Sequence, residues 1–324
     1  MIRKAFSLIL SLTLILCIFS GCTDSGNLSP DGILNIVCTT FPIYDWARNI
    51  TDGAENVNIQ LLIEGGTDLH SYQATAGDIV KIATADIFIY TGGDSDKWIN
   101  DVLKITENDN TVLVDLMHNL PEESLFCVEA VGEENHHHEE EDEHDHNHLQ
   151  DEHIWLSLKN AKLLTEIIKN VLCDTDSKNR EIYEKNFRSF YKEIDLLDKS
   201  YEEAIRSCKG DTLVFADRFP FIYLTKDYGL TYFAAFSGCS SESDASFETV
   251  TRLAQKLDEN QLSYILVKET SDGTVAETVK SCTKEKNQKI LTLNALQSIK
   301  KGNSSVSYIE VMRENLDILK TALS

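Results

Sequence analysis

Seven of the nine histidines in this sequence lie between His136 and His153, in the stretch HHHEEEDEHDHNHLQDEH. Imidazole and carboxylate side chains are the groups that together hold divalent transition metals in proteins. No lysine or arginine occurs from Ile105 to Leu158, so no nearby basic side chain neutralises the negative charge of this stretch. Composition alone leaves two interpretations open: a metal-collecting loop, or a solvated acidic loop in which the histidines are incidental.

Two further contexts place histidines where α/β proteins bind ligands. His70 follows an expected strand over 57–63 and a glycine turn, and His153 opens the helix expected after the histidine-rich stretch. In open α/β sheets, ligands bind beyond the carboxyl ends of the strands. A lone histidine at either place is more often a satisfied polar residue than a ligand. Two of them in one acidic chain favour a metal site.

Short apolar runs alternate with helical patterns in both halves of the chain. The expected strands cover 34–38, 57–63, 86–90, 111–115, 212–215, 231–236, 263–267 and 289–293. The expected helices cover 43–52, 78–85, 98–105, 247–260, 274–286 and 308–323. This βαβα order predicts parallel sheets that are covered by helices on both faces.

Between the two halves, residues 176–209 predict one long helix, because apolar residues recur every three or four positions without a glycine or proline. A helix of roughly thirty residues spans about 45 Å, which is the size of a domain. We therefore predict an α/β fold of two lobes, each a mostly parallel sheet flanked by helices, joined by this rigid helix with a binding site in the cleft between them. One large doubly wound domain with an internal helix is the alternative.

The N-terminus has the pattern of a targeting segment. Two basic residues precede an apolar run that is too short for a membrane span, and the run ends in small residues directly before Cys22. This pattern resembles a bacterial lipoprotein signal over 1–21, with Cys22 as the lipid-bearing residue, and predicts a chain anchored on the extracytoplasmic face of the cell membrane. A plain secretory signal or an uncleaved anchor is the alternative.

The remaining boundaries follow from composition and from the expected elements. Polar, turn-forming residues over 22–33 predict a flexible tether. The predicted divisions after it are an N-terminal lobe over 34–173 with the histidine- and acid-rich loop 128–152, a linking helix over 174–210, and a C-terminal lobe over 211–324.

Charge and cysteine usage narrow the possible partners. The formal net charge is −23, which suits attraction of cations and argues against nucleic acid, because phosphate binding needs a basic patch. Six cysteines follow Cys22 without any C-x-x-C pair, so we expect most of them to be small buried residues and assign no disulfide.

Several stretches together resemble one known family. These are CTTFPIYDWARNI, GGTDLHSYQATAGDI, ADIFIYTGGDSDKWI, the histidine- and acid-rich loop, DEHIWLSLKNA and KILTLNALQS, and they run from about Leu34 to the C-terminus. The chain resembles the metal-binding lipoproteins of bacterial zinc and manganese ABC importers, the cluster A-I solute-binding proteins. The resemblance implies two lobes on a rigid helix, a metal in the cleft, and a monomer that delivers the metal to a permease and its ATPase.

The resemblance also implies metal ligands. His70 and His153 match the first two ligands of the family, both from the N-terminal lobe. Zinc members commonly add a histidine from the C-terminal lobe, but no histidine occurs after His153 here. Asp217 is the nearest replacement, although it could instead pair with Arg218 or cap a helix that begins near Phe219.

Two other positions bear on the fourth ligand. Glu269 follows the expected strand 263–267 and matches an acidic position of the family, so we predict it as a ligand too. Asn294 occupies the place where many members have an aspartate ligand. Two imidazoles and one or two carboxylates satisfy zinc, which prefers about four ligands, and they do not exclude manganese.

The histidine-rich loop then takes an auxiliary role. The auxiliary metal-binding residues predicted in it are His136, His137, His138, His144, His146 and His148. We expect these imidazoles to bind metal weakly, because ordering such a loop costs conformational entropy. Such loops accompany the zinc members of the family more often than the manganese members, so the resemblance favours Zn²⁺, with Mn²⁺ as the alternative.

Other classes of protein fit the sequence less well. A zinc hydrolase often carries H-E-x-x-H, and this motif is absent, as are G-x-S-x-G and a P-loop lysine. We therefore expect no enzymatic activity. An extracellular metal-storage or adhesion lipoprotein would share the histidine-rich loop but would not need His70 and His153 in a two-lobed cleft.

Overall fold

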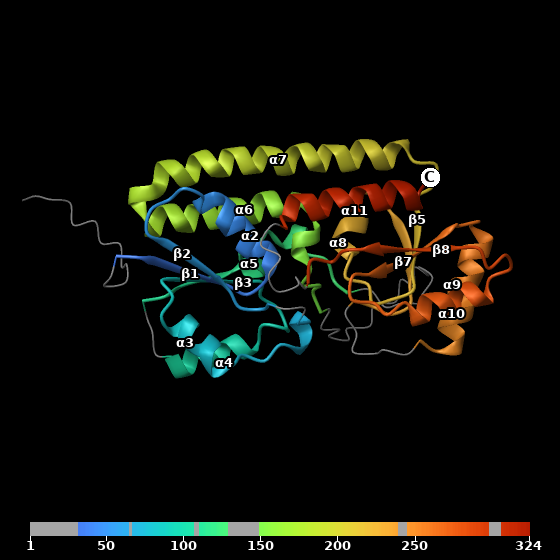
Figure 1. The fold of residues 1–324 in the computed structure, drawn as a ribbon, viewed down its shortest axis with the longest axis horizontal. Coiled ribbons are helices and arrows are strands. Elements are labelled where there is room, and N and C mark those ends of the chain that lie inside the picture. Colours follow the sequence, from blue (N-terminus) through green and yellow to red (C-terminus); the bar gives the residue numbers. More distant parts are fainter. Residues whose placement is uncertain (1–31, 65–66, 107–109, 129–148, 239–244, 298–305) are drawn as a thin grey trace, which may run out of the picture.

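The fold comes from a computed structural model, which describes residues 32–64, 67–106, 110–128, 149–238, 245–297 and 306–324. Two sheets lie side by side along the long axis of the molecule (Figure 1). The first has the parallel order β2-β1-β3-β4, and the second has the parallel order β6-β5-β7-β8. The strands are β1 (Leu34–Cys38), β2 (Val57–Leu61), β3 (Ile87–Tyr90), β4 (Val112–Asp115), β5 (Thr212–Phe215), β6 (Thr231–Ala234), β7 (Tyr264–Lys268) and β8 (Lys289–Leu293).

Helices cover both sheets. They are α2 (Phe41–Thr51), α3 (Ala76–Ala83), α4 (Trp98–Thr106), α5 (Leu116–Asn119), α6 (Leu158–Thr175), α7 (Arg180–Ser207), α8 (Ile222–Asp227), α9 (Phe247–Glu259), α10 (Thr274–Cys282) and α11 (Tyr308–Ala322). Figure 1 shows α6 and α11 beneath α7, with α3 and α4 at the far side of the first sheet and α9 and α10 beside the second. This arrangement confirms the predicted α/β fold of two lobes.

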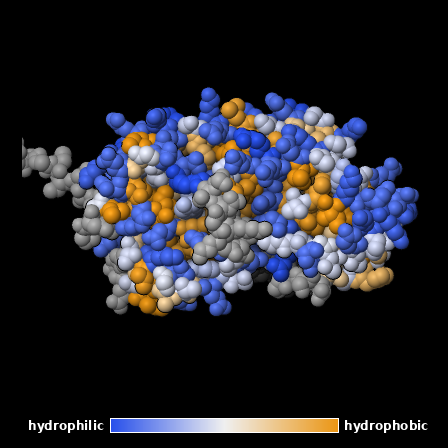
Figure 2. All heavy atoms as spheres, in the orientation of Figure 1, coloured by the Kyte–Doolittle hydropathy of each residue, from blue (hydrophilic) through white to orange (hydrophobic). Residues whose placement is uncertain are grey.

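The long helix α7 runs along both lobes, as the sequence predicts (Figure 1). It has 28 residues and so spans about 42 Å. Its apolar stripe is buried against α6, α2 and α11 through Tyr183, Phe190, Ile194, Leu197 and Tyr201. Hydrophilic residues predominate along the opposite, outer edge (Figure 2).

One apolar core extends through both lobes. It includes Trp46 and Phe88 of the first lobe, Tyr201 of α7, and Phe215 and Leu293 of the second. A second, smaller cluster lies under α9 and α10. Because α6, α7 and α11 pack as a shared layer, the carboxyl ends of the strands of the two sheets are held in a defined relation to one another.

Three elements differ from the sequence-based expectation. His153 does not open a long helix: it precedes the 3-10 turn Ile154–Leu156, and α6 begins only after Ser157, whose side chain caps the Asn160 N–H. The helix expected to begin near Phe219 begins at Ile222 as α8, and α5 was not predicted, since four residues are too few for a periodic pattern.

The N-terminal segment, Cys22 and the six auxiliary histidines lie outside the described residues. Among the helices of the described ranges, none is both long and apolar enough to cross a membrane. Of the cysteines after Cys22 in the described ranges, Cys38 and Cys173 are buried, Cys208 is partly buried, and Cys127 and Cys282 are exposed. The expectation that most of them are buried is therefore wrong for the described residues.

Candidate metal centre

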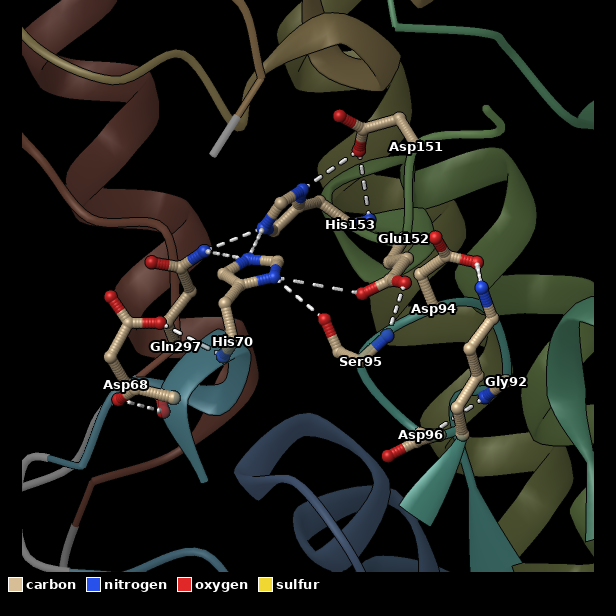
Figure 3. Close-up of polar contacts among 12 residues, drawn as sticks. Asp68, His70, Gly92, Asp94, Ser95, Asp96, Asp151, Glu152, His153 and Gln297 are labelled. Atoms are coloured by element: carbon tan, nitrogen blue, oxygen red, sulfur yellow. Dashed lines mark hydrogen bonds and ion pairs between the residues drawn. The ribbon is translucent and has the colours of Figure 1, made fainter. Parts of the chain in front are cut away.

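His70 and His153 meet between the two lobes, although they are 83 residues apart in the chain (Figure 3). Their Nε2 atoms are 3.3 Å apart. Two nitrogen donors at about 2.0–2.1 Å from a tetrahedrally coordinated zinc ion lie about 3.3–3.4 Å apart. The two imidazoles therefore have the spacing of two vertices of a zinc tetrahedron.

His70 is oriented by groups of its own lobe. Its 3-10 turn, Leu69–Ser71, is capped by Asp68, whose carboxylate accepts the His70 N–H at 3.0 Å. The ring Nδ1 lies 2.7 Å from Ser95 Oγ and 3.7 Å from Glu152 Oε2. Glu152 in turn accepts the Ser95 N–H at 2.7 Å. These contacts occupy Nδ1 and leave Nε2 directed toward His153.

His153 is held by Asp151. The Asp151 Oδ1 atom accepts the His153 backbone N–H at 2.9 Å and lies 2.8 Å from the ring Nδ1. Because a carboxylate only accepts hydrogen bonds, Nδ1 carries the proton and Nε2 keeps its lone pair for a metal. Both side chains are buried, and the Tyr223 hydroxyl donates to the Asp151 carbonyl at 2.7 Å. This is the carboxylate–histidine arrangement that commonly supports metal ligands.

The second lobe brings an amide and two cations to the same place. Gln297 Nε2 lies 2.5 Å from His153 Nε2 and 3.5 Å from His70 Nε2 (Figure 3). Lys268 Nζ lies 3.3 Å from Gln297 Oε1. Lys268 and Arg218 both reach the carboxylate of Asp68 in the first lobe, at 3.7 and 3.4 Å. The centre therefore lies where the carboxyl ends of both sheets face each other.

The predicted carboxylates of the second lobe contact backbone amides. Asp217 accepts the N–H groups of Arg218 at 2.7 Å and Lys268 at 3.2 Å. It does not cap a helix near Phe219, since α8 starts at Ile222 without a side-chain cap. Within the described part of the chain, no group of three or more His, Cys, Asp or Glu residues is arranged to hold a metal. Ligation by Asp217 stays a prediction.

Glu269 and Asn294 shape the loop that carries Gln297. Glu269 accepts the N–H groups of Ala295 at 2.9 Å and Gln297 at 3.3 Å. Asn294 accepts the N–H of Leu296, which has a φ of +59°. Both side chains therefore stabilise a tight turn after β8, and ligation by Glu269 also stays a prediction.

Buried charge surrounds the two imidazoles. Burial, opposed by the hydrogen bond from the Gly92 N–H and aided by the negative charges of Glu152 and Asp115, raises the pKa of Asp96 to about 7. Burial also acts to raise the pKa of Asp68, but the N–H of His70 and the charges of Lys268 and Arg218 hold it below its ordinary value.

A backbone constraint keeps Glu152 close to this cluster. Gly93 has a φ of +84°, and a Cβ atom there would lie 2.7 Å from Glu152 Cγ. Any other residue at this position would therefore displace the carboxylate that accepts the Ser95 N–H.

Six residues of the centre were not predicted from the sequence: Asp68, Ser95, Asp151, Glu152, Lys268 and Gln297. A signal existed for some of them. Gln297 belongs to the stretch NALQS directly after β8, so the strand-end argument that selected Glu269 also covers it. Asp68 and Glu152 are close neighbours of the two histidines in the chain. Lys268 carried no such signal, because a lysine is not a metal ligand at neutral pH.

Two α/β lobes on a long helix, with paired imidazoles between them, define the class of two-lobed solute-binding proteins. Comparison with known families agrees with this class. The family described as "Zinc-uptake complex component A periplasmic" matches residues 36–322, and the chain belongs to this family.

Curated relatives extend over most of the chain. The zinc-binding lipoprotein AdcA of Streptococcus pneumoniae serotype 4 is 30% identical over 98% of this chain, which spans 60% of the length of that relative. The high-affinity zinc uptake system protein ZnuA of Bacillus subtilis is 28% identical, with 90% of this chain and 88% of the relative covered.

Solved structures share the fold. The Zn(II)-bound ZnuA-like domain of Streptococcus pneumoniae AdcA has a TM-score of 0.71 at 27% identity, covering 90% of this chain and 99% of that one. The metal-dependent lipoprotein YcdH of Bacillus subtilis has a TM-score of 0.73 at 26% identity, with the same coverage.

Proposed function

We propose that this chain is an extracytoplasmic solute-binding lipoprotein that captures zinc and delivers it to an ABC-type membrane importer. The observation that carries the proposal is the 3.3 Å spacing of the His70 and His153 Nε2 atoms, with both Nδ1 atoms occupied by groups of the first lobe. Imidazole suits zinc better than manganese, which prefers oxygen ligands. The family is one of transport components rather than of enzymes.

The relatives support zinc as the cargo. Their names describe a zinc-binding lipoprotein and a zinc uptake system protein, and one related structure is Zn(II)-bound. By this likeness, the partners are an importer permease and its ATPase, and the chain acts as a monomer. Lipid on Cys22 would keep it at the outer face of the cell membrane.

We further propose His70 and His153 as the metal ligands of the first lobe, and Asp217 and Glu269 as the carboxylate ligands of the second. Each carboxylate would exchange a backbone N–H partner for the metal, because both now accept two such groups. The auxiliary histidines between His136 and His148 would collect metal weakly beside the centre, since a short tether gives an effective concentration of about millimolar.

Metal titration of the purified chain tests this function. Calorimetry with zinc, and separately with manganese, is expected to give one tight zinc site and weaker binding of manganese. A crystal structure with anomalous scattering at the zinc edge would identify the ligands. Failure to bind any metal stoichiometrically would overturn the importer function, and tighter binding of manganese would favour a manganese-specific protein of the same family.

An extracellular metal-storage or adhesion lipoprotein remains the alternative of a different class. Such a protein would not need a permease, so its deletion should leave growth in zinc-depleted medium unchanged. The importer function instead predicts a growth defect of the deletion strain in this medium. Labelling with radioactive palmitate, compared between wild type and Cys22→Ser, tests the lipid anchor. Unchanged labelling in the variant would contradict lipidation at Cys22.

A further inference from the structure

Lys268 is a buried cation beside the paired imidazoles. It is the last residue of β7, and 6% of it is exposed. Its ammonium contacts Gln297 Oε1 at 3.3 Å and Asp68 Oδ2 at 3.7 Å. Burying a lysine costs free energy that a neutral side chain of similar size avoids. The Lys268 charge therefore lowers the stability of the fold unless its neighbours compensate for it.

Within the described residues, the carboxylate that pairs with this ammonium is shared with a second cation. Asp68 is its ion-pair partner, but Arg218 also reaches Asp68, so one carboxylate faces two cations. Asp217 accepts the Lys268 N–H, and Glu269, the next residue in the chain, accepts the N–H groups of Ala295 and Gln297. A dication between His70 and His153 would be separated from the Lys268 charge by one amide group, and like charges repel strongly where little water screens them.

Lys268 also determines which end of the Gln297 amide faces the imidazoles. An ammonium group can only donate hydrogen bonds, so the amide oxygen turns toward Lys268. The amide NH₂ then points at His153 Nε2, at 2.5 Å, and donates to the lone pair that a metal would use. An amide nitrogen that carries two hydrogens is not a metal ligand. In this orientation the Gln297 oxygen faces away from the imidazoles and is not offered to a metal. The His153 Nε2 atom accepts the amide N–H, so its lone pair is engaged.

We propose that Lys268 sets the affinity of the centre for divalent metal, by lowering it through charge repulsion and through the orientation of Gln297. This inference rests on the proposed function and concerns the regulation of the same site. A solute-binding protein must release its cargo to the importer. A cation beside the site would lower its affinity for the metal, and so aid release, without removing a ligand.

Substitution of Lys268 tests the inference in the full chain. Lys268→Met removes the charge and the donor at similar volume, and zinc affinity is expected to tighten by about tenfold or more. Lys268→Gln removes the charge but keeps an NH₂ donor toward Gln297, so a smaller gain is expected. Lys268→Arg keeps the positive charge, so it should not tighten zinc binding as Lys268→Met does. Competition with a chromophoric zinc chelator measures affinity, and stopped-flow chelation measures a slower release from Lys268→Met.

The matched control is Lys280→Met on α10, where the lysine pairs with Glu277 at 3.8 Å, and no change in affinity is expected. Unfolding curves verify that each variant is folded, and Lys268→Gln serves if Lys268→Met does not fold. If wild type binds zinc and neither neutral variant binds it more tightly, this inference is wrong while the proposed function stands. If no variant and no wild-type protein binds zinc, both are wrong.

Discussion

The two lobes contribute to the proposed metal centre in different ways. The first lobe supplies two imidazoles whose Nδ1 atoms are already engaged by Asp151 and Ser95, so their Nε2 atoms converge without further movement. The second lobe supplies the Gln297 amide and the Lys268 ammonium, and its predicted carboxylates are bonded to backbone amides. The first lobe thus has a preorganised pair of imidazoles, and the side chains of the second lobe are proposed to adjust the affinity for metal.

This contrast has a physical origin in the loops. In the first lobe, acidic and hydroxyl side chains next to the histidines satisfy the imidazoles themselves. In the second, the tight turns after β5 and β8 expose N–H groups, and Asp217 and Glu269 satisfy those groups instead. A buried N–H left without an acceptor costs free energy, so a nearby carboxylate is readily drawn to it.

The largest expected effect is the loss of an imidazole. His153→Ala or His70→Ala should weaken zinc binding by more than about 100-fold, beyond the range typical of groups that merely support ligands. Calorimetric titration measures it. His118→Ala, an exposed histidine on α5, is the control and should bind as wild type does. An equal loss in His118→Ala would contradict the assignment of the centre to His70 and His153.

The next effect concerns the support of His153. Asp151→Ala removes the acceptor of both the ring Nδ1 and the backbone N–H, and zinc binding should weaken by about 10–100-fold. Chelator competition is the measurement, and Asp174→Ala at an exposed position is the control. Unchanged affinity in Asp151→Ala would mean that the first lobe is less prepared than its geometry indicates.

Stability should depend on pH through Asp96. Its pKa rises from 3.8 to about 7, so between these values the folded state binds more protons than the unfolded state, and stability falls as pH rises. Asp96→Asn keeps an acceptor for the Gly92 N–H and removes the buried charge. The free energy of unfolding should rise by about 1–3 kcal/mol at about pH 8, with little change at about pH 4.

Urea denaturation at both pH values measures this difference, with Asp94→Asn as the control, since Asp94 is exposed and pairs with Lys97. An Asp96→Asn variant that is less stable than wild type at both pH values would show that this carboxylate stabilises the first lobe rather than straining it.

A smaller effect is expected in the second lobe. Glu269→Gln leaves one oxygen to accept the N–H groups of Ala295 and Gln297, so the loop of Gln297 should loosen and zinc affinity should fall by about tenfold. The same titration measures it. A loss as large as that of the histidine variants would show that the second lobe contributes as much to affinity as the first, and would remove the contrast between the lobes. No loss at all would contradict the proposed ligation by Glu269.

The smallest effect on the tight site is expected from the histidine-rich stretch. Deleting 133–148 should leave tight binding of zinc unchanged and remove only weaker additional sites, because ordering a histidine-rich loop around a metal costs conformational entropy. Calorimetry at excess zinc separates the two classes of site. If the deletion abolished the tight site, tight binding would depend on the histidine-rich stretch as well as on His70 and His153.

The sequence by itself determined the elements and the two histidines. Periods of two and of three to four residues are local properties, and they predicted every strand and the long helix to within a few residues. The strand-end argument also identified His70. The short helix α5 was not predicted, because four residues are too few to show a period.

Only the tertiary structure decided how the centre is completed. The approach of His70 Nε2 to His153 Nε2 joins residues 83 apart, and the contact of His153 with Gln297 joins residues 144 apart. Which acceptors the turn amides take depends on distances between loops that no local pattern encodes. For that reason, ligation by Asp217 and Glu269 stays a prediction from the sequence. Only the folded chain shows that their carboxylates accept backbone N–H groups and that Gln297 and Lys268 lie beside the imidazoles.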